Sequence, residues 1–133
     1  MKFPYVHLGD SDMPIIPVTL NLGENYIVTE ALVDSGAASC IFDAQFAEVL
    51  GITDLVENGQ EIVFEGISGH TLTGYCHDVT LIIGGYQCPR IRIAFSRDMP
   101  DNAVNILGQQ GFFELFPIKF TYGKKEIDVM FEA

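Results

Sequence analysis

The side chains most able to do chemistry lie in one short stretch, Asp34-Ser35-Gly36-Ala37, directly after an apolar run. Asp, Ser and Gly each favour turns for local reasons, and an Asp-Ser/Thr-Gly triplet arises by chance in roughly one chain in twenty of this length. The context is more informative than the triplet. Leu32-Val33 and Ala37-Ala38 flank the carboxylate with small and apolar residues, which predicts that it is buried. Because a buried carboxylate needs a physical reason, Asp34 is the first candidate for a reactive group.

Two later segments carry further candidates. In Phe64-Glu65-Gly66-Ile67-Ser68-Gly69-His70, glycines surround one Ile at the expected tip of a hairpin, where an exposed Ile has no core to fill. In Val104-Asn105-Ile106-Leu107-Gly108, the end of an apolar strand meets a glycine. When each segment is taken alone, a hairpin turn and a strand-to-helix joint are the better explanations.

The elements that must position these residues are mainly strands. Alternating or β-branched runs, broken by Gly, Pro and Asn, predict strands over 15–22, 26–33, 61–67, 71–83, 87–95, 118–122 and 127–131. Two short helices are expected. Asp43 can cap one over 44–50, with Gly51 as its stop, and the other covers 108–116 before Pro117. Many closely spaced strands with few helices favour a closed or orthogonally packed β-barrel.

Composition limits the classes of function. The chain has 133 residues, which fits one domain over residues 1–133, and a formal net charge of −11. Nucleic acid and anionic membranes are not expected as partners, because both are bound through Lys and Arg. The apolar runs fall far short of the roughly 20 residues of a membrane span, and no secretory signal is present, so a cytoplasmic protein is expected.

The three cysteines, Cys40, Cys76 and Cys88, are odd in number and lack C-x-x-C spacing, which predicts free thiols in a reducing compartment. Neighbouring residues of a strand point to opposite faces, so Cys76 and His77 cannot face one metal ion together with His70 and Cys88. Neither a metal nor another cofactor is expected.

Taken in order, the three segments resemble the retropepsin family, the single-domain aspartic proteases of retroviral type, over residues 14–120. Asp34-Ser35-Gly36-Ala37 is similar to the family signature, Gly66-Ile67-Ser68-Gly69 to the flap tip, and Ile106-Leu107-Gly108 to the apolar pair and glycine near the site. The resemblance implies a closed β-barrel with one or two short helices. It also implies that Asp34 is catalytic, that Ser35 bonds across a dimer axis, that Gly36 lets the backbone approach the carboxylate, and that the flap closes over a peptide.

Hydrolysis of a peptide by such an enzyme requires two carboxylates that share one proton, the arrangement for which the aspartic proteases are a standard example. The chain contains Asp-Ser-Gly once and no Asp-Thr-Gly, so a single copy cannot supply both carboxylates. The resemblance therefore predicts a homodimeric aspartic endopeptidase that acts on a peptide or protein substrate. Two alternatives remain open: a catalytically silent peptide-binding or dimerisation module of the same fold, and a monomeric barrel in which the Asp34 loop is only a turn.

The chain departs from the retroviral pattern in three places. Ala38 and Gln109 stand where an acidic residue and an Arg usually pair, so both halves of that ion pair are missing together. Ser68 and His70 differ from the usual flap residues, and the terminal hairpin over 118–131 is longer than the retroviral C-terminus. Neither substrate specificity nor the way the dimer is sealed can be carried over from the family.

Overall fold

The computed structural model describes residues 1–65 and 69–131. The protein is mainly β, with 57% strand and 7% helix, which confirms the expected fold class. The strands are β1 (Lys2–Pro4), β2 (Val6–Leu8), β3 (Ser11–Met13), β4 (Ile15–Leu22), β5 (Asn25–Val33), β6 (Cys40–Asp43), β7 (Gln60–Glu65), β8 (Thr71–Ile83), β9 (Tyr86–Ser96), β10 (Asn105–Leu107), β11 (Ile118–Thr121) and β12 (Glu126–Val129). The helices are α1 (Ala44–Val49) and the 3-10 turn η1 (Tyr122–Lys124).

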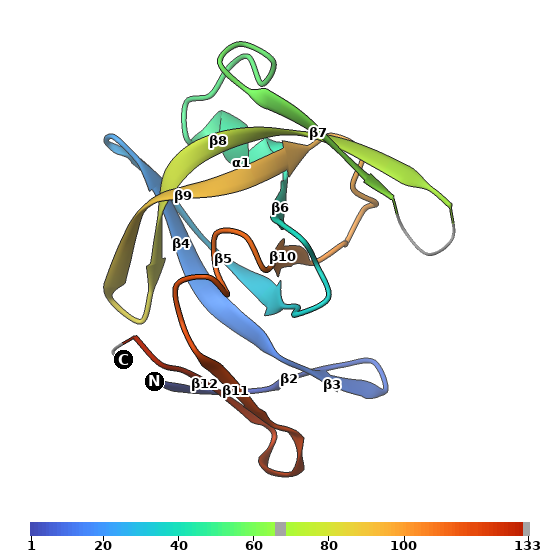
Figure 1. Cartoon of the computed structure of the whole chain (residues 1–133), viewed down its shortest axis with the longest axis vertical. Helices are drawn as coiled ribbons and strands as arrows, with labels where there is room; N and C mark the ends of the chain where they lie inside the picture. The colour runs from blue at the N-terminus through green and yellow to red at the C-terminus, as the bar shows by residue number, and fades with distance from the viewer. Residues whose placement is uncertain (66–68, 132–133) are drawn as a thin grey trace.

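Six of the strands close into a barrel (Figure 1). The sheet runs β4-β5-β10-β6-β9-β8, and a short pairing of β8 with β4 at Thr19–Asn21 returns it to its start. Two of the pairings are parallel: β10 lies beside β5, and β6 lies beside β9. As a result, the carboxyl end of β5, which leads to Asp34, is next to the carboxyl end of β10, which leads to Gly108.

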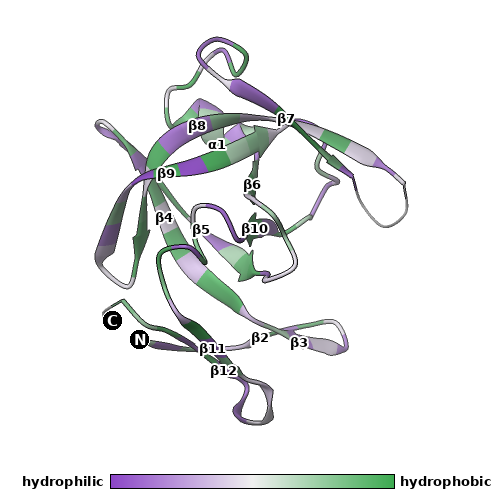
Figure 2. Ribbon diagram, in the orientation of Figure 1, coloured by the Kyte–Doolittle hydropathy of each residue, from purple (hydrophilic) through white to green (hydrophobic). Residues whose placement is uncertain are grey.

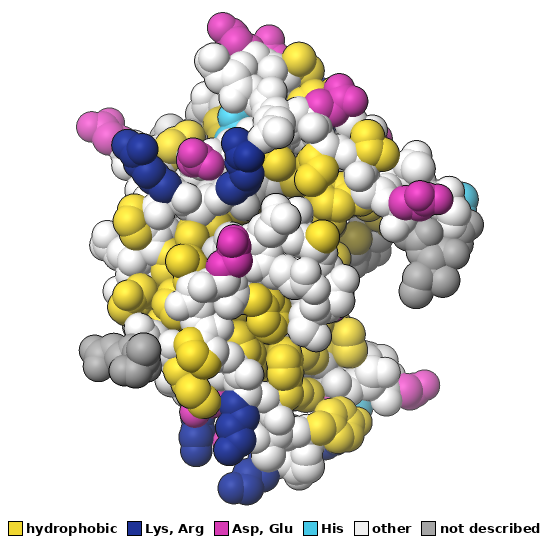
Figure 3. All heavy atoms as spheres, viewed as in Figure 1, with side chains coloured by type: hydrophobic (Ala, Val, Ile, Leu, Met, Phe, Trp, Pro, Cys, Tyr) yellow, Lys and Arg dark blue, Asp and Glu magenta, His cyan; other side chains and the backbone are white. Residues whose placement is uncertain are grey.

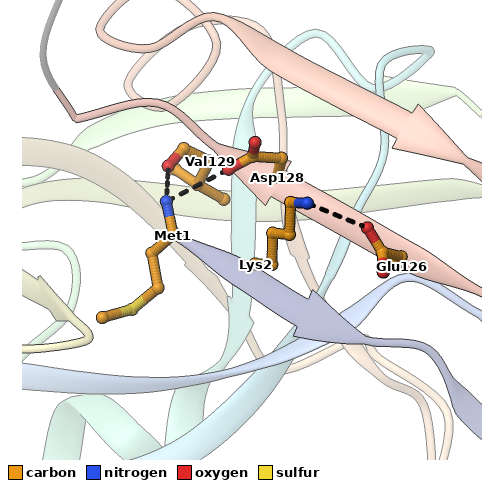
Figure 4. Close-up of polar contacts among 5 residues, drawn as sticks. All are labelled: Met1, Lys2, Glu126, Asp128 and Val129. Carbon is orange, nitrogen blue, oxygen red and sulfur yellow. Dashed lines mark hydrogen bonds and ion pairs between the residues drawn. The ribbon is translucent and has the colours of Figure 1, made fainter.

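The chain ends form a second sheet outside the barrel. Its order is β1-β12-β11, so the first and last strands of the chain pair with each other (Figure 1). The Met1 amine donates to the Val129 carbonyl oxygen at 2.6 Å and to Asp128 at 3.1 Å, and Lys2 forms an ion pair with Glu126 at 3.7 Å (Figure 4). These contacts join β1 to β12. A separate hairpin, β2–β3, connects this sheet to β4.

Alternate side chains along the strands point inward and fill the interior of the barrel. On β4, Ile16, Val18 and Leu20 are buried, and on β8 the same period places Val79, Leu81 and Ile83 inside. Figure 2 shows the matching alternation of hydrophobic and hydrophilic residues along these strands. Burying one such side chain contributes about 1.5–3 kcal/mol, so this repeating pattern sets the register of the barrel strands.

Helix α1 confirms the prediction for 44–50. The Asp43 side chain accepts the Gln45 N–H at 3.0 Å, as an N-cap does, and Gly51 adopts φ +90° directly after the helix. It is not long enough to cross a membrane, and the described residues include no helix that is.

The second predicted helix, over 108–116, is wrong, because this segment consists of turns. Gly111 has φ +97°, a left-handed conformation that ends helical geometry, and Phe113 donates to Gly108 five residues back instead of four. Phe112 and Phe116 are nevertheless buried in the core. These two rings are therefore buried by the packing of a turn and not by one face of a helix.

Candidate functional site

Asp34 lies at the point where three strands end or begin. Its N–H donates to the Leu107 carbonyl oxygen at 3.0 Å, and the preceding Val33 N–H donates to the Pro14 carbonyl oxygen at 2.9 Å. The ends of β5 and β10 and the residue before β4 thus fix the backbone on which the carboxylate stands. Asp34 itself is half-buried. Its position is therefore held by the barrel while its side chain remains accessible.

The loop after Asp34 folds back onto the carboxylate. The Gly36 N–H donates to Asp34 Oδ1 at 2.9 Å, and the Ala37 N–H donates to the Asp34 carbonyl oxygen at 3.2 Å. A Cβ on Gly36 would lie 3.3 Å from Asp34 Oδ1, so a glycine leaves room for this close approach. Ser35 and Gly36 are exposed to solvent. The loop therefore presents its hydroxyl and its backbone away from the barrel.

The segment Ile106-Leu107-Gly108 forms the wall behind this loop. Ile106 and Leu107 pair in parallel with Leu32 and Val33 on β5. Gly108 packs so closely against the loop that a Cβ there would lie 2.7 Å from the Ala37 carbonyl oxygen and nearer still to that of Ser39. Both the apolar pair and the glycine thus lie in contact with the chain that carries Asp34.

Cys40 joins the same two segments through its thiol. Its Sγ accepts the Gly108 N–H at 3.4 Å, and the S–H donates to the Gln110 carbonyl oxygen at 3.5 Å. Burial raises the pKa of Cys40 to about 11, although the bond from Gly108 acts in the opposite direction. Burial also raises the pKa of Cys88 to about 11. These thiols are therefore protonated at neutral pH and act as packing groups, not as nucleophiles.

We expect the cysteines to resist alkylation in the folded protein. All three are buried, and a pKa raised from 9.0 to about 11 leaves Cys40 and Cys88 with little thiolate at pH 8. Iodoacetamide at pH 8 should therefore modify none of them under native conditions and all of them in denaturant, as counted by mass spectrometry. Rapid native modification at Cys40 would show that the wall behind the Asp34 loop opens readily.

Gln109 makes a contact with the loop that its residue type alone did not predict. Its side-chain Nε2 donates to the Ser35 carbonyl oxygen at 2.7 Å, and its backbone N–H donates to the Ala37 carbonyl oxygen at 2.8 Å. From the sequence, Gln109 was noted only because the retroviral proteases usually have an Arg at this position. In the structure its neutral amide holds the Asp34 loop by hydrogen bonds without an ionic partner.

Gln109→Glu should lower the free energy of unfolding by about 1 kcal/mol, because a carboxylate cannot donate to the Ser35 carbonyl oxygen. The replacement is almost isosteric, so packing is unchanged. Gln110→Glu adds the same charge at the next position, which is also exposed, and leaves the Ser35 contact intact. Urea denaturation measures the free energy of unfolding of both variants. Equal values would mean that the Gln109 amide does not hold the loop.

The β7–β8 hairpin extends from the barrel above the Asp34 loop (Figure 1). Of the predicted flap residues, Gly66, Ile67 and Ser68 lie outside the described residues. Gly69 has φ +81° and open space where a Cβ would be. The hairpin and the loop are the two sides of one groove.

This groove has a volume of about 1160 Å³. Figure 3 shows the molecule hollowed on this side, with hydrophobic side chains along the edge of the hollow. The Asp34 loop, β6, β10, both arms of the hairpin and the turn after β9 all border the groove. Its lining residues are Asp34, Gly36, Ala37, Ala38, Ile41, Val63, Phe64, Glu65, His70, Thr71, Leu72, Asp98, Pro100 and Ile106. It is mostly apolar with a few carboxylates, as a site for an extended peptide would be.

Asp98 is a groove residue that the sequence did not identify. It follows β9, and only the pairing of β9 with β8 brings it beside the hairpin, where its carboxylate accepts the Thr73 N–H at 2.9 Å. No local pattern around Asp98 signals this contact. For metal chemistry, the described part of the chain offers no group of three or more His, Cys, Asp or Glu side chains placed to hold an ion.

A family model described as "Aspartyl protease" matches residues 7–107. The match includes the Asp34 loop, the hairpin, Asp98 and β10, and it leaves out β1, β11 and β12. A search of curated proteins found no match.

Proposed function

Because the chain belongs to the aspartyl protease family, we propose that it is an aspartic endopeptidase that acts as a homodimer with one Asp34 from each subunit. The observation that carries this proposal is the position of Asp34, a half-buried carboxylate at the wall of a groove of about 1160 Å³. The hydrogen bond from Gly36 holds that carboxylate in one orientation. A fixed, accessible carboxylate in a peptide-sized groove suits the activation of water.

The chemistry and the exposure of the loop both support the proposed dimer. One carboxylate cannot both take a proton from water and protonate the carbonyl oxygen of the peptide, whereas two carboxylates that share a proton can. The loop beside Asp34 is exposed at Ser35 and Gly36, so a second copy can approach it without unfolding either chain. A two-fold axis at this loop would bring the two Asp34 side chains together and would join the two grooves into one cleft.

The residues around the proposed pair have separate roles. The ionised Asp34 takes a proton from the water that attacks the peptide carbonyl, while its protonated partner donates to the carbonyl oxygen. Asp34 then passes the proton that it took from water to the leaving nitrogen, and as the C–N bond breaks the tetrahedral hydroxyl returns a proton to the partner carboxylate. Gly36 steadies the carboxylate through its N–H, and Ser35 would bond across the axis. The hairpin arms, with Val63 and Leu72 in the groove, would cover the peptide and exclude water.

The proposal is tested by the dependence of cleavage on protein concentration. A mixed peptide library incubated with the protein should be cleaved, a pepstatin-type inhibitor should block cleavage, and the activity per chain should fall as the protein is diluted below the dimer dissociation constant. Sedimentation over the same concentrations identifies the species. Inhibitor binding with no cleavage would instead indicate a silent peptide-binding module, and a strict monomer that cleaves peptides would refute the shared pair.

We also propose a cytoplasmic site of action. The observation in favour is that Cys40, Cys76 and Cys88 are all buried free thiols, the form in which cysteines persist in a reducing compartment.

A further inference from the structure

Asp98 lines the groove with a carboxylate whose orientation is fixed. Its Oδ2 accepts the Thr73 N–H at 2.9 Å, and its own N–H donates to Ser96 Oγ at 3.1 Å. Ser96 is fully buried, and its hydroxyl donates to the Thr73 carbonyl oxygen at 2.7 Å. These bonds connect the turn after β9 to the base of the hairpin. Asp98 remains exposed to solvent, and among the described residues the structure gives no hydrogen bond to its other oxygen, Oδ1.

The charged residues of the groove wall are almost all acidic. Asp34, Glu65 and Asp98 line it together with His70, and no Lys or Arg is among the lining residues that the structure describes. In Figure 3 the Lys and Arg side chains on this face lie at the upper left and at the bottom, away from the hollow. The chain as a whole carries a net charge of −11. A peptide in the groove therefore meets carboxylates with no Lys or Arg among the described lining residues; Arg97, which directly precedes Asp98, is not one of them.

We propose that Asp98 is a specificity-determining residue, and that the preferred substrate is an extended peptide with a Lys or Arg near the scissile bond. This inference rests on the proposed function, since it concerns the choice among peptides that the groove cleaves. A basic side chain beside Oδ1 gains a charge-assisted hydrogen bond, whereas an acidic side chain at the same place is repelled.

Asp98 suits this role better than Glu65 does. Glu65 is an exposed side chain with an additional torsion at the end of β7, so an ion pair with it must order one more torsion than an ion pair with Asp98. The Asp98 carboxylate is already held by Thr73, so most of that ordering cost has been met before substrate binds. A fixed carboxylate also selects one position along the peptide, whereas a mobile one would act at several.

The test uses three peptides that differ at one residue. A peptide that the parent protein cleaves is made with Lys, Gln or Glu at a single position, and that position is moved through the residues on both sides of the scissile bond. At one position kcat/KM for the Lys peptide should exceed that for the Glu peptide by about tenfold. Asp98→Asn, which keeps an oxygen to accept the Thr73 N–H, should reduce this ratio to about twofold or threefold.

Asp78→Asn is the matched control, because it removes the same charge from an exposed position on β8 that does not line the groove. It should keep the tenfold ratio. Raising NaCl from about 0.05 M to about 0.5 M should reduce the ratio in the parent protein, which tests the charge effect without any substitution.

The possible outcomes distinguish a failure of the proposed peptidase activity from a failure of the proposed role of Asp98. A parent protein that cleaves no peptide refutes the proposed function. A parent that cleaves all three peptides equally refutes only the preference, and an unchanged ratio in folded Asp98→Asn refutes the role of Asp98. A folded, dimeric Asp98→Asn that cleaves nothing also overturns the inference, because Asp98 would then serve the reaction and not the choice of peptide.

Discussion

Asp34→Asn should fold and dimerise normally and should cleave peptides at least about a thousandfold more slowly than the parent protein. Asn is nearly isosteric with Asp, and its side-chain oxygen can still accept the Gly36 N–H that now reaches Asp34 Oδ1 at 2.9 Å. The loop should therefore keep its shape. What is lost is the group that takes a proton from water, because a neutral amide cannot act as that base.

The matched control for this change is Asp54→Asn. Asp54 also accepts backbone N–H groups through Oδ1, from Val56 at 3.1 Å and Glu57 at 3.3 Å, and it does not line the groove. It should retain full activity. Circular dichroism and sedimentation establish that both variants are folded and associated as the parent is, and kcat/KM on one cleaved peptide gives the comparison. A folded Asp34→Asn protein with parental activity would remove Asp34 from the mechanism.

Gly108→Ala should lower the free energy of unfolding by about 3 kcal/mol and should also reduce activity. The added Cβ would lie 2.7 Å from the Ala37 carbonyl oxygen and nearer still to that of Ser39. Both are backbone atoms, so neither can move aside by rotating a side chain. The loop would have to shift as a whole, and it would carry Gly36 and the Asp34 carboxylate with it.

Gly123→Ala separates this effect from the general cost of replacing a glycine. Gly123 lies in η1 after β11, and apart from its chain neighbours and the backbone of that turn no heavy atom lies within 4 Å of the position that its Cβ would take, so the added methyl group meets open space. Its effect on stability should be within about 0.5 kcal/mol, as for most surface changes. Denaturant titration of the two variants gives both values. If Gly108→Ala is as stable as Gly123→Ala, the close packing of Gly108 against the loop does not restrain it.

The sequence predicted the parts of the fold in which local pattern and tertiary packing agree. The bounds of β4 and β8 were predicted as observed, because long alternating runs carry the period of a half-buried strand. Helix α1 was predicted from the Asp43 cap and the Gly51 stop. The long hairpin that forms one side of the groove was therefore visible in the sequence as far as its two arms.

Elements whose stability comes from distant partners were not predicted. Strand β1 has only three residues, too few to show a period, and it forms through pairing with β12 at the other end of the chain. The segment over 108–116 was predicted as a helix that ends before Pro117, yet the positive φ of Gly111 and the core positions of Phe112 and Phe116 impose turns.

The residues of the candidate site were likewise predicted only in part. The order Asp34, hairpin tip, Gly108 was visible as three motifs, and the parallel pairing of β10 with β5 brings the first and third together. The contact of Gln109 with Ser35 and the position of Asp98 in the groove depend on the closed barrel, so neither has a signal in the residues around it.

The most direct test of the paired Asp34 residues is a mixing experiment. Inactive Asp34→Asn protein is added in increasing excess to a fixed amount of the parent, with time for subunits to exchange, and peptide cleavage is measured. With nine inactive chains for each parent chain, about one parent subunit in ten keeps a parent partner, so the activity should fall to about a tenth. Activity that stays constant as the inactive chain is added would show that one chain suffices, and it would contradict an active site built from two copies of Asp34.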